Sequence, residues 1–343
     1  MPPLADLSGT PDAPRLLADI GGTHARLAWQ ECRGAPLRAV QVLSCADHAG
    51  LAEAVAHWLK THDLPAPGKA ALALACPVGS DHVQLTNNPW SFSIQALKAR
   101  LGLEQLAVVN DFKALALALP VLDPAHLLSL GGDPQKPFAR REPVALLGAG
   151  TGLGVSGLLP NQLGGWTALS GEGGHISLAV HDDAQSRVWS VLRERHGHVS
   201  AEQVLSGQGI VNIHASLQCL ATGHWPSQEL SPAQVSALAL EKQDPMAVQT
   251  LELFCNWLGS TAGDLALTLG AVGGVFMGGG IAPRLKGFLQ SSGFRSSFEN
   301  KGRFSAYLSP IPVWLIDSPT SPALLGVATL LDGDDTGQPR SSF

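Results

Sequence analysis

A short glycine-rich turn that follows an apolar stretch occurs in both halves of the chain. In the first half the turn at residues 21–23 separates two predicted strands, residues 15–20 and 25–30. In the second half the turn at 148–152 follows a predicted strand at 143–147 and leads into another apolar stretch. Glycine lets the backbone turn tightly or approach a ligand closely. Because further alternating strands and helices follow each turn, the repeat predicts an α/β protein with two related lobes.

The composition allows a large folded core and argues against several classes of partner. The chain has 343 residues, of which 45% are hydrophobic and 15% are charged. With 22 Lys and Arg against 28 Asp and Glu, the net charge of −6 argues against binding nucleic acid through a basic surface. No signal peptide or apolar stretch of membrane-spanning length is recognised, so no membrane partner is expected. Five scattered cysteines without a CxxC pair suit reduced thiols, and we expect a cytoplasmic protein.

The predicted elements suggest where the lobes divide. We expect the first lobe to take residues 1–120 and to regain a last helix at about 317–331, and the second lobe to take 121–316. The polar end, 332–343, reads as a frayed tail. Further strands are predicted at 37–44, 69–75, 106–109, 274–277 and 313–316, and helices at 48–60, 93–101, 111–119 and about 321–331.

The first glycine turn carries side chains that suit a phosphate group. Asp19 stands near the end of the first predicted strand, and Gly21, Gly22 and Thr23 follow it. Free backbone N–H groups and the Thr23 hydroxyl can hold phosphate oxygens, while the Asp19 carboxylate can hold hydrated Mg²⁺. A plain hairpin that uses Gly-Gly for its backbone conformation is the alternative, and by itself this motif does not decide between them.

Recurrence of the turn favours phosphate binding. A second turn contains Gly150, Thr151 and Gly152, and a third contains Gly278, Gly279 and Gly280 before a helix that Pro283 could open. Two glycine turns with a threonine, one in each lobe, could hold a polyphosphate from both sides. Residues 152–157 also match GxGxxG, but proline and glycine residues follow instead of a helix, so a dinucleotide site is not expected.

The pair Asn110-Asp111 lies where a predicted strand ends and a helix begins. Asp111 could therefore be the N-cap of that helix, which is the more common role for an aspartate at such a boundary. Alternatively, its carboxylate could accept a proton from an attacking hydroxyl group. The position alone leaves both interpretations open.

Two glycine-rich polar segments suit a ligand with several hydroxyl groups. Glu172 and His175 lie among glycines that offer little to pack against, and Glu202 lies at what could be a helix start. Each carboxylate can accept hydrogen bonds from two neighbouring hydroxyls. Glu202 could instead simply favour the dipole of the first helical turn. Asn87 could also contribute, although Asn-Asn-Pro commonly marks a turn.

Taken in order, these segments resemble the bacterial ATP-dependent glucokinases of the proteobacterial type. The resemblance rests on ADIGGTHARLAW, ALACP, LTNNPWSFS, VVNDF, GAGTGLGV, GEGGH, GHVSAEQVLSG, GGVFMGGGIAPR and GFRSSFENKGRF, and it covers residues 16–331. It implies the actin-like, ribonuclease H-like ATPase fold, with two lobes and a cleft between them. It also implies ATP-dependent phosphorylation of the 6-hydroxyl of glucose, Mg²⁺ as cofactor and a homodimer.

The resemblance also implies a role for each matching residue. Asp111 falls on the general base. The expected sugar ligands are Asn110, Asp111, Glu172, His175 and Glu202; the expected ATP ligands are Asp19, Gly21, Gly22, Thr23, Gly150, Thr151, Gly152, Gly278, Gly279 and Gly280. Asp19 would orient Mg²⁺ through water. Two positions depart from the family pattern, His24 where Asn is common and Ser170 where Pro is common.

Three other functions stay open on the sequence. A kinase for another hexose would keep the same motifs, and a sugar sensor would keep them without turnover. An actin-like or chaperone-like ATPase would hydrolyse ATP without sugar. The related ROK sugar kinases and repressors usually carry a cysteine-rich zinc motif beside the substrate histidine; none follows His175, which favours the non-zinc glucokinases.

Overall fold

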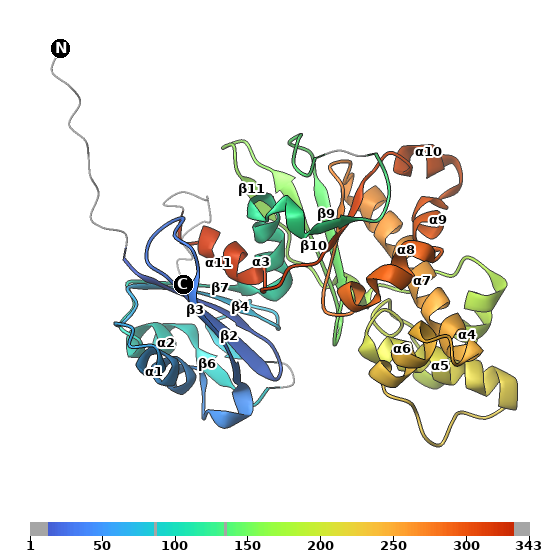
Figure 1. Cartoon of the computed structure of the whole chain (residues 1–343), viewed down its shortest axis with the longest axis horizontal. Helices are drawn as coiled ribbons and strands as arrows, with labels where there is room; N and C mark the ends of the chain where they lie inside the picture. The colour runs from blue at the N-terminus through green and yellow to red at the C-terminus, as the bar shows by residue number, and fades with distance from the viewer. Residues whose placement is uncertain (1–12, 86–87, 134–135, 333–343) are drawn as a thin grey trace, which may run out of the picture. The chain divides into compact units, whose positions relative to one another are not determined.

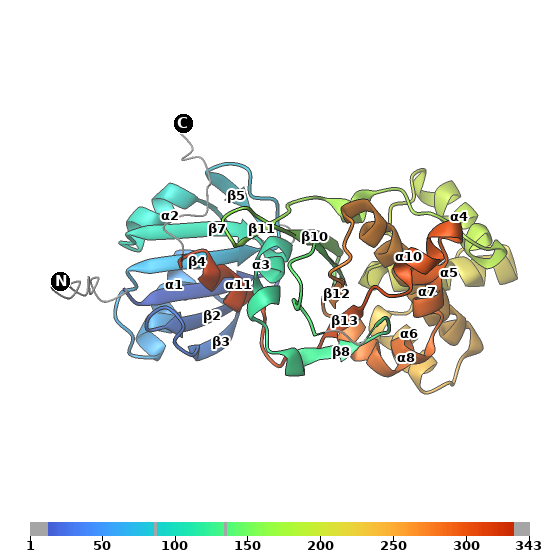
Figure 2. The same ribbon diagram turned by 90° about the horizontal axis from the view of Figure 1, so that it is seen from above.

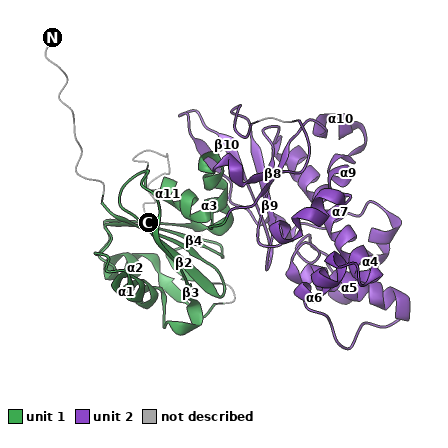
Figure 3. Cartoon of the chain, in the orientation of Figure 1, with its two compact units in different colours: residues 1–122, 319–343 green, residues 123–318 purple. Residues whose placement is uncertain are grey.

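The chain forms two compact units, which Figure 3 shows in separate colours. The computed structural model describes residues 13–85, 88–133 and 136–332. One unit comprises the described residues up to Leu122 together with those from Pro319 onward, and the other comprises Asp123–Ser318. The sequence predicts these divisions at residues 120 and 317. No helix in the described ranges has the length and apolar character needed to cross a bilayer.

The first unit is built on a mixed five-stranded sheet (Figure 1). Its strand order is β3-β2-β1-β4-β7, in which β1, β4 and β7 are parallel and β2 and β3 are antiparallel to their neighbours. The strands are β1 (Arg15–Ile20), β2 (His24–Gln30), β3 (Arg38–Ser44), β4 (Lys69–Leu74) and β7 (Gln105–Asn110). Parallel strands end at one edge of a sheet, so the ends of β1 and β7 bring distant polar residues to that edge.

Helices cover both faces of this sheet because side chains alternate along each strand. On β1, Leu16 and Ile20 belong to one core with Trp58 of α1, whereas Leu17 belongs to a second core with Leu324 of α11. Figures 1 and 2 show α1 and α2 on one face and α3 and α11 on the other. These helices are α1 (Leu51–Thr61), α2 (Ile94–Arg100), α3 (Asp111–Ala118) and α11 (Ala323–Thr329). A two-stranded sheet, β5 (His82–Gln84) with β6 (Ser91–Ser93), completes the unit.

The second unit repeats the plan of the first sheet and adds one strand. Its order is β11-β10-β9-β12-β13-β8, and β9, β12 and β13 are parallel in the way that β1, β4 and β7 are. The antiparallel strands β10 and β11 correspond to β2 and β3. The strands are β8 (Leu127–Ser129), β9 (Val144–Ala149), β10 (Leu153–Pro160), β11 (Trp166–Ala168), β12 (Val275–Gly278) and β13 (Val313–Ile316). The predicted repeat is therefore confirmed at the level of strand order.

In the described part of the second unit, seven α-helices, most of them unforeseen in the sequence, pack around a large apolar core. Residues of β9, β12 and β13 form this core together with the long helix α7. On the other face of the sheet, Phe276 stacks on Phe138 and also contacts Trp314. The helices are α4 (Asp183–His196), α5 (Gly207–Thr222), α6 (Pro232–Leu240), α7 (Pro245–Leu269), α8 (Lys286–Ser291), α9 (Phe294–Glu299) and α10 (Ser305–Leu308).

Three predicted element boundaries need correction. The helix predicted from residue 48 begins at Leu51, after a 3-10 turn at Cys45–Asp47 and the N-cap Gly50. Pro283 lies in a 3-10 turn, Ala282–Leu285, and α8 begins only after it. Asp332, the predicted start of a frayed tail, accepts a hydrogen bond from the buried Arg15; the rest of that tail lies outside the described residues.

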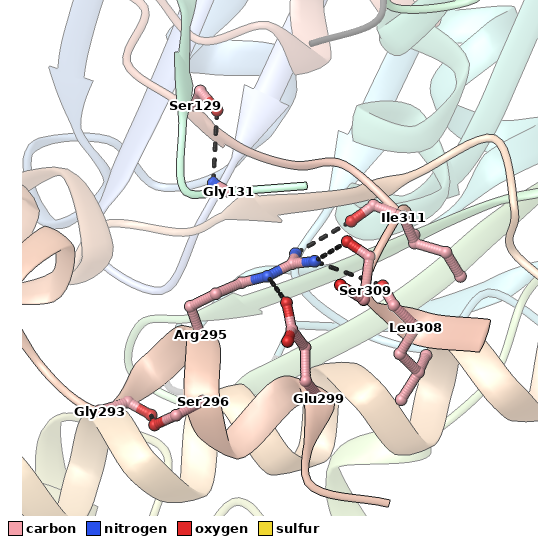
Figure 4. Close-up of polar contacts among 9 residues, drawn as sticks. All are labelled: Ser129, Gly131, Gly293, Arg295, Ser296, Glu299, Leu308, Ser309 and Ile311. Carbon is pink, nitrogen blue, oxygen red and sulfur yellow. Dashed lines mark hydrogen bonds and ion pairs between the residues drawn. The ribbon is translucent and has the colours of Figure 1, made fainter. Parts of the chain in front are cut away.

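Arg295 fastens α9 to the segment that leads into β13 (Figure 4). Its Nη1 donates to the Ile311 carbonyl at 2.9 Å, and its Nη2 donates to the carbonyls of Ser309 at 2.7 Å and Leu308 at 3.3 Å. Its Nε donates to Glu299 at 2.5 Å. The planar guanidinium group thus donates to the last carbonyl of α10, Leu308, which also accepts from the Ile311 N–H, and to two carbonyls that follow the helix.

We expect Arg295→Lys to lower the free energy of unfolding by about 2 kcal/mol, because an ammonium group cannot reach three carbonyls and a carboxylate together. Urea unfolding followed by tryptophan fluorescence measures this. Arg187→Lys changes an exposed arginine of α4 in the same way and is the matched control. Equal unfolding midpoints for the two variants would contradict the role given to Arg295.

Candidate active site

In the first unit, the shared edge of β1 and β7 brings two carboxylates near each other. Asp19 is the fifth residue of β1, and Asp111 follows the last residue of β7. The two residues are 92 positions apart in the sequence, yet they are near enough for the negative charge of Asp19 to raise the pKa of Asp111. Asp19 itself is held in place: its Oδ2 accepts hydrogen bonds from Ser321 at 2.7 Å and from Arg26 at 3.3 Å.

Asn110, and not Asp111, is the N-cap of α3. The Asn110 Oδ1 accepts hydrogen bonds from the N–H groups of Phe112 at 2.9 Å and Lys113 at 3.3 Å. Asp111 is the first residue of the helix, and its Oδ1 also accepts from the Phe112 N–H at 2.9 Å. The interpretation of Asp111 as the cap is therefore wrong, because the residue before it already satisfies the first free N–H groups.

The surroundings of Asp111 disfavour its charged form. The pKa of Asp111 is raised to about 6, chiefly by burial and in part by the negative charge of Asp19, while the hydrogen bond from the Phe112 N–H acts in the opposite direction. The ordinary value of an aspartate is 3.8. A carboxylate with such a pKa is ionised at neutral pH and still takes up a proton readily, as a general base must.

The first glycine turn is a tight connection between β1 and β2. The Gly21 N–H donates to the His24 carbonyl at 2.9 Å, and the Asn88 side chain donates to the Gly21 carbonyl at 3.1 Å. Thr23 is exposed, and its hydroxyl lies 2.9 Å from Nδ1 of His24. The residue that departs from the family pattern thus contacts the threonine of the turn. Gly22, between Gly21 and Thr23, is partly exposed.

In the second unit, the second and third glycine turns lie against each other. Gly278 pairs with Gly148 across the parallel strands β12 and β9, and the Ile281 N–H donates to the Ala149 carbonyl at 3.2 Å. Gly279 has a φ of +79°, and a Cβ there would lie 2.3 Å from the Ala149 carbonyl oxygen. Only glycine fits that position, so Gly278–Gly280 stays close to the turn that contains Gly150, Thr151 and Gly152.

Glu202 joins the second turn to the segment that carries Glu172 and His175. Its backbone N–H donates to the Gly174 carbonyl at 2.8 Å. Its side-chain Oε2 accepts a hydrogen bond from the Leu153 N–H at 2.9 Å, directly after the turn. The structure therefore brings together three of the predicted sugar ligands and one predicted phosphate turn within one unit.

Glu172 is the N-cap of a single 3-10 turn, Gly173–His175, and His175 is its last residue; both side chains are exposed. The His175 N–H donates to the Glu172 carbonyl at 3.0 Å, so both side chains belong to the same short loop. Gly174 at its centre is buried against Leu153: a Cβ there would lie 2.2 Å from the Leu153 carbonyl oxygen. The glycines of this segment thus let it lie directly on the second turn.

Two further predictions about these segments are settled. Helix α5 begins at Gly207 with Ser206 as its N-cap, so Glu202 lies outside the helix and the interpretation through the helix dipole is wrong. Residues 153–160 form strand β10, so the GxGxxG match is followed by no helix, as predicted. Asn87 lies outside the described residues.

Comparison with known proteins gives the family of this chain. The Glucokinase family profile matches residues 16–334. The chain belongs to the glucokinase family. A glucokinase of Aromatoleum aromaticum is 48% identical over 95% of this chain and 96% of its own length, and one of Chromobacterium violaceum is 47% identical over 94% and 91%. Membership of the glucokinase family at this identity makes the protein an enzyme.

Solved glucokinases share the fold over almost the whole chain. A glucokinase from an Antarctic psychrotroph superposes with a TM-score of 0.83 at 37% identity, covering 93% of this chain and 99% of its own. A ROK-family glucokinase of Streptomyces griseus, solved with glucose and AMPPNP, has a TM-score of 0.58 at 20% identity and covers 92% of this chain and 98% of its own. The fold is the two-lobed, actin-like fold of glucokinases and ROK sugar kinases.

Three residues at the site were not foreseen in the sequence. Arg26 and Ser321 hold Asp19, and the Leu153 N–H holds Glu202. Ser321 lies 302 positions from Asp19, and a backbone N–H carries no signal in the residue type. Arg26 alone had a usable signal, because on the antiparallel strand after the turn it pairs directly with Asp19.

We expect Asp111→Asn to stabilise the fold at neutral pH but not in acid. Between about pH 4 and pH 6 the folded state keeps a proton on Asp111 that the unfolded state has released, so wild-type stability falls as pH rises through this window. The variant should therefore gain up to about 3 kcal/mol over wild type by pH 7 and nothing at pH 4.

Urea unfolding of both proteins at several pH values measures the difference. Glu104→Gln, which removes an exposed carboxylate from the same unit, is the control. A difference between Asp111→Asn and wild type that stays constant from pH 4 to pH 7 would show that burial does not raise the pKa of Asp111.

Proposed function

We propose that this protein transfers the γ-phosphoryl group of ATP to the 6-hydroxyl of D-glucose, giving glucose 6-phosphate and ADP. Asp111 acts as the general base: it takes the proton of the hydroxyl as the oxygen attacks phosphorus, and the bond from phosphorus to the ADP oxygen breaks. The observation that carries this is the placement of Asp111. Asn110 caps the helix, so the carboxylate of Asp111 is not needed for that task.

The other residues bind the two substrates. The carboxylates of Glu172 and Glu202 accept hydrogen bonds from sugar hydroxyls, and the His175 ring accepts or donates one. The exposed positions of Glu172 and His175 support this role. Asn110 contributes its amide group, which donates to the Cys76 carbonyl at 3.4 Å and has a second proton for a sugar oxygen. The three glycine turns bind ATP through backbone N–H groups, with Gly278–Gly280 next to adenosine.

Asp19 suits the Mg²⁺ that accompanies ATP. Its side chain is 13% exposed and only its Oδ2 accepts the hydrogen bonds from Arg26 and Ser321, so Oδ1 remains for a metal-bound water. Carboxylate and water oxygens are the ligands that Mg²⁺ prefers. When bound, Mg²⁺ neutralises charge on the phosphate oxygens. Similarity to the family further supports a homodimer in the cytoplasm.

ADP release from MgATP, measured with and without sugars, tests the reaction. We expect glucose to stimulate release strongly, and mannose, fructose, N-acetylglucosamine and N-acetylmannosamine to do so much less. Stimulation by another of these sugars would keep the mechanism and change the substrate. Rapid ADP release without sugar, or glucose binding without turnover, would contradict the proposal.

We expect Asp111→Asn to lower kcat about 10²- to 10⁴-fold, the contribution of a positioned base. The amide keeps the oxygen that accepts from the Phe112 N–H, so the helix start is preserved. In the wild type, kcat/KM should fall about tenfold per pH unit below pH 6, where Asp111 becomes protonated. A folded variant with near-normal kcat would remove Asp111 from this role.

A further inference from the structure

The carboxylate of Glu202 occupies the space that a side chain at residue 152 would fill. A Cβ built on Gly152 would lie 2.4 Å from Oε2 of Glu202 and 3.2 Å from its carboxyl carbon. The same Oε2 accepts the hydrogen bond from the Leu153 N–H at 2.9 Å. A glycine at 152 therefore allows the carboxylate to lie directly on the second turn.

The neighbouring glycine of the same turn has no such contact. A Cβ on Gly150 would meet nothing within 4 Å, and neither Gly150 nor Gly152 has a backbone φ in the left-handed region. Backbone conformation therefore does not require glycine at either position. What a side chain would meet therefore differs between the two positions, because the Glu202 carboxylate lies against Gly152 and not against Gly150.

We propose that Gly152 is a positioning residue for the sugar: by leaving room for the Glu202 carboxylate, it lets the Leu153 N–H set the orientation of a sugar ligand. This rests on the proposed function, in which Glu202 binds glucose and the turn binds ATP. The Oε2 of Glu202 is then held by the Leu153 N–H, and its Oε1 remains for the sugar hydroxyls.

The backbone around Leu153 explains why this contact can orient the whole sugar segment. The Leu153 carbonyl lies against Gly174, whose own carbonyl accepts the N–H of Glu202. The loop with Glu172 and His175, the turn, and Glu202 are thus fastened to one another at a single residue. Because Glu202 contacts both the turn and the sugar segment, we expect it to couple the two substrates. Such coupling is reciprocal, so displacing Glu202 should reduce equally the effect of glucose on nucleotide binding and that of nucleotide on glucose binding.

The comparison of Gly152→Ala with Gly150→Ala tests the proposal. The new methyl group at 152 meets the far end of a flexible side chain, so we expect Glu202 to give up its hydrogen bond with the Leu153 N–H and swing away while the fold is kept. Loss of a hydrogen bond to a charged group corresponds to about a tenfold to hundredfold change in affinity. We expect Gly152→Ala to weaken glucose binding by this factor in isothermal titration calorimetry without nucleotide, and Gly150→Ala to change it less than twofold.

Two further measurements separate this effect from a general defect. Titration with AMPPNP, with and without glucose, should show that glucose changes nucleotide affinity in the wild type and less so in Gly152→Ala. In ¹⁵N-labelled wild type, glucose alone should shift the Leu153 amide resonance, a test that does not depend on any variant folding.

Each outcome has a clear meaning. Equal glucose affinities for Gly150→Ala and Gly152→Ala, or a Leu153 amide that glucose leaves unmoved, would overturn the role of Gly152 while the proposed function stands. Wild-type protein that binds no glucose would overturn the proposed function itself, and this inference with it.

Discussion

The parallel pairing of β1, β4 and β7 is the constraint on which the first half of the site depends. Parallel strands must begin at one edge of a sheet and end at the other, so residues 19 and 110, far apart in the sequence, reach the same edge. The hydrogen bonds of α3 then decide what each polar residue there does. Since Asn110 satisfies the helix start, Asp111 remains as a carboxylate whose protonation is controlled by burial and by Asp19.

The second unit uses the same strand order for a different purpose. Its turn between β9 and β10 corresponds to the one between β1 and β2. Directly after this turn, the Leu153 N–H donates a hydrogen bond to the Glu202 carboxylate. Glycines at 152 and 174 make this possible, because each leaves room for a neighbouring group to lie on the backbone. Two copies of one architecture thus present different groups, two carboxylates at a sheet edge in one unit and a hydrogen-bonded carboxylate on a glycine turn in the other.

Two alternatives that the sequence left open fail for one reason, which is that another polar residue nearby performs the same structural task. Asp111 has the residue type of an N-cap, yet Asn110 stands one residue earlier and takes that place. Glu202 has the type of a first-turn acid, yet Ser206 begins the helix instead. The long helix α7 was not predicted for another reason: it is buried on more than one side, as the consecutive buried residues Leu253, Phe254 and Cys255 show, so its apolar residues do not follow a single face.

The sequence by itself determined the two α/β repeats, most strands of both sheets and the residue types of the site, since glycine turns and apolar runs are local signals. Family motifs added the expected roles. Only the tertiary structure decided that Ser321 holds Asp19, that Glu202 lies on Gly152, and that burial raises the pKa of Asp111. These are contacts between distant segments and properties of the space around a group, and neither is written in the spacing of residues along the chain.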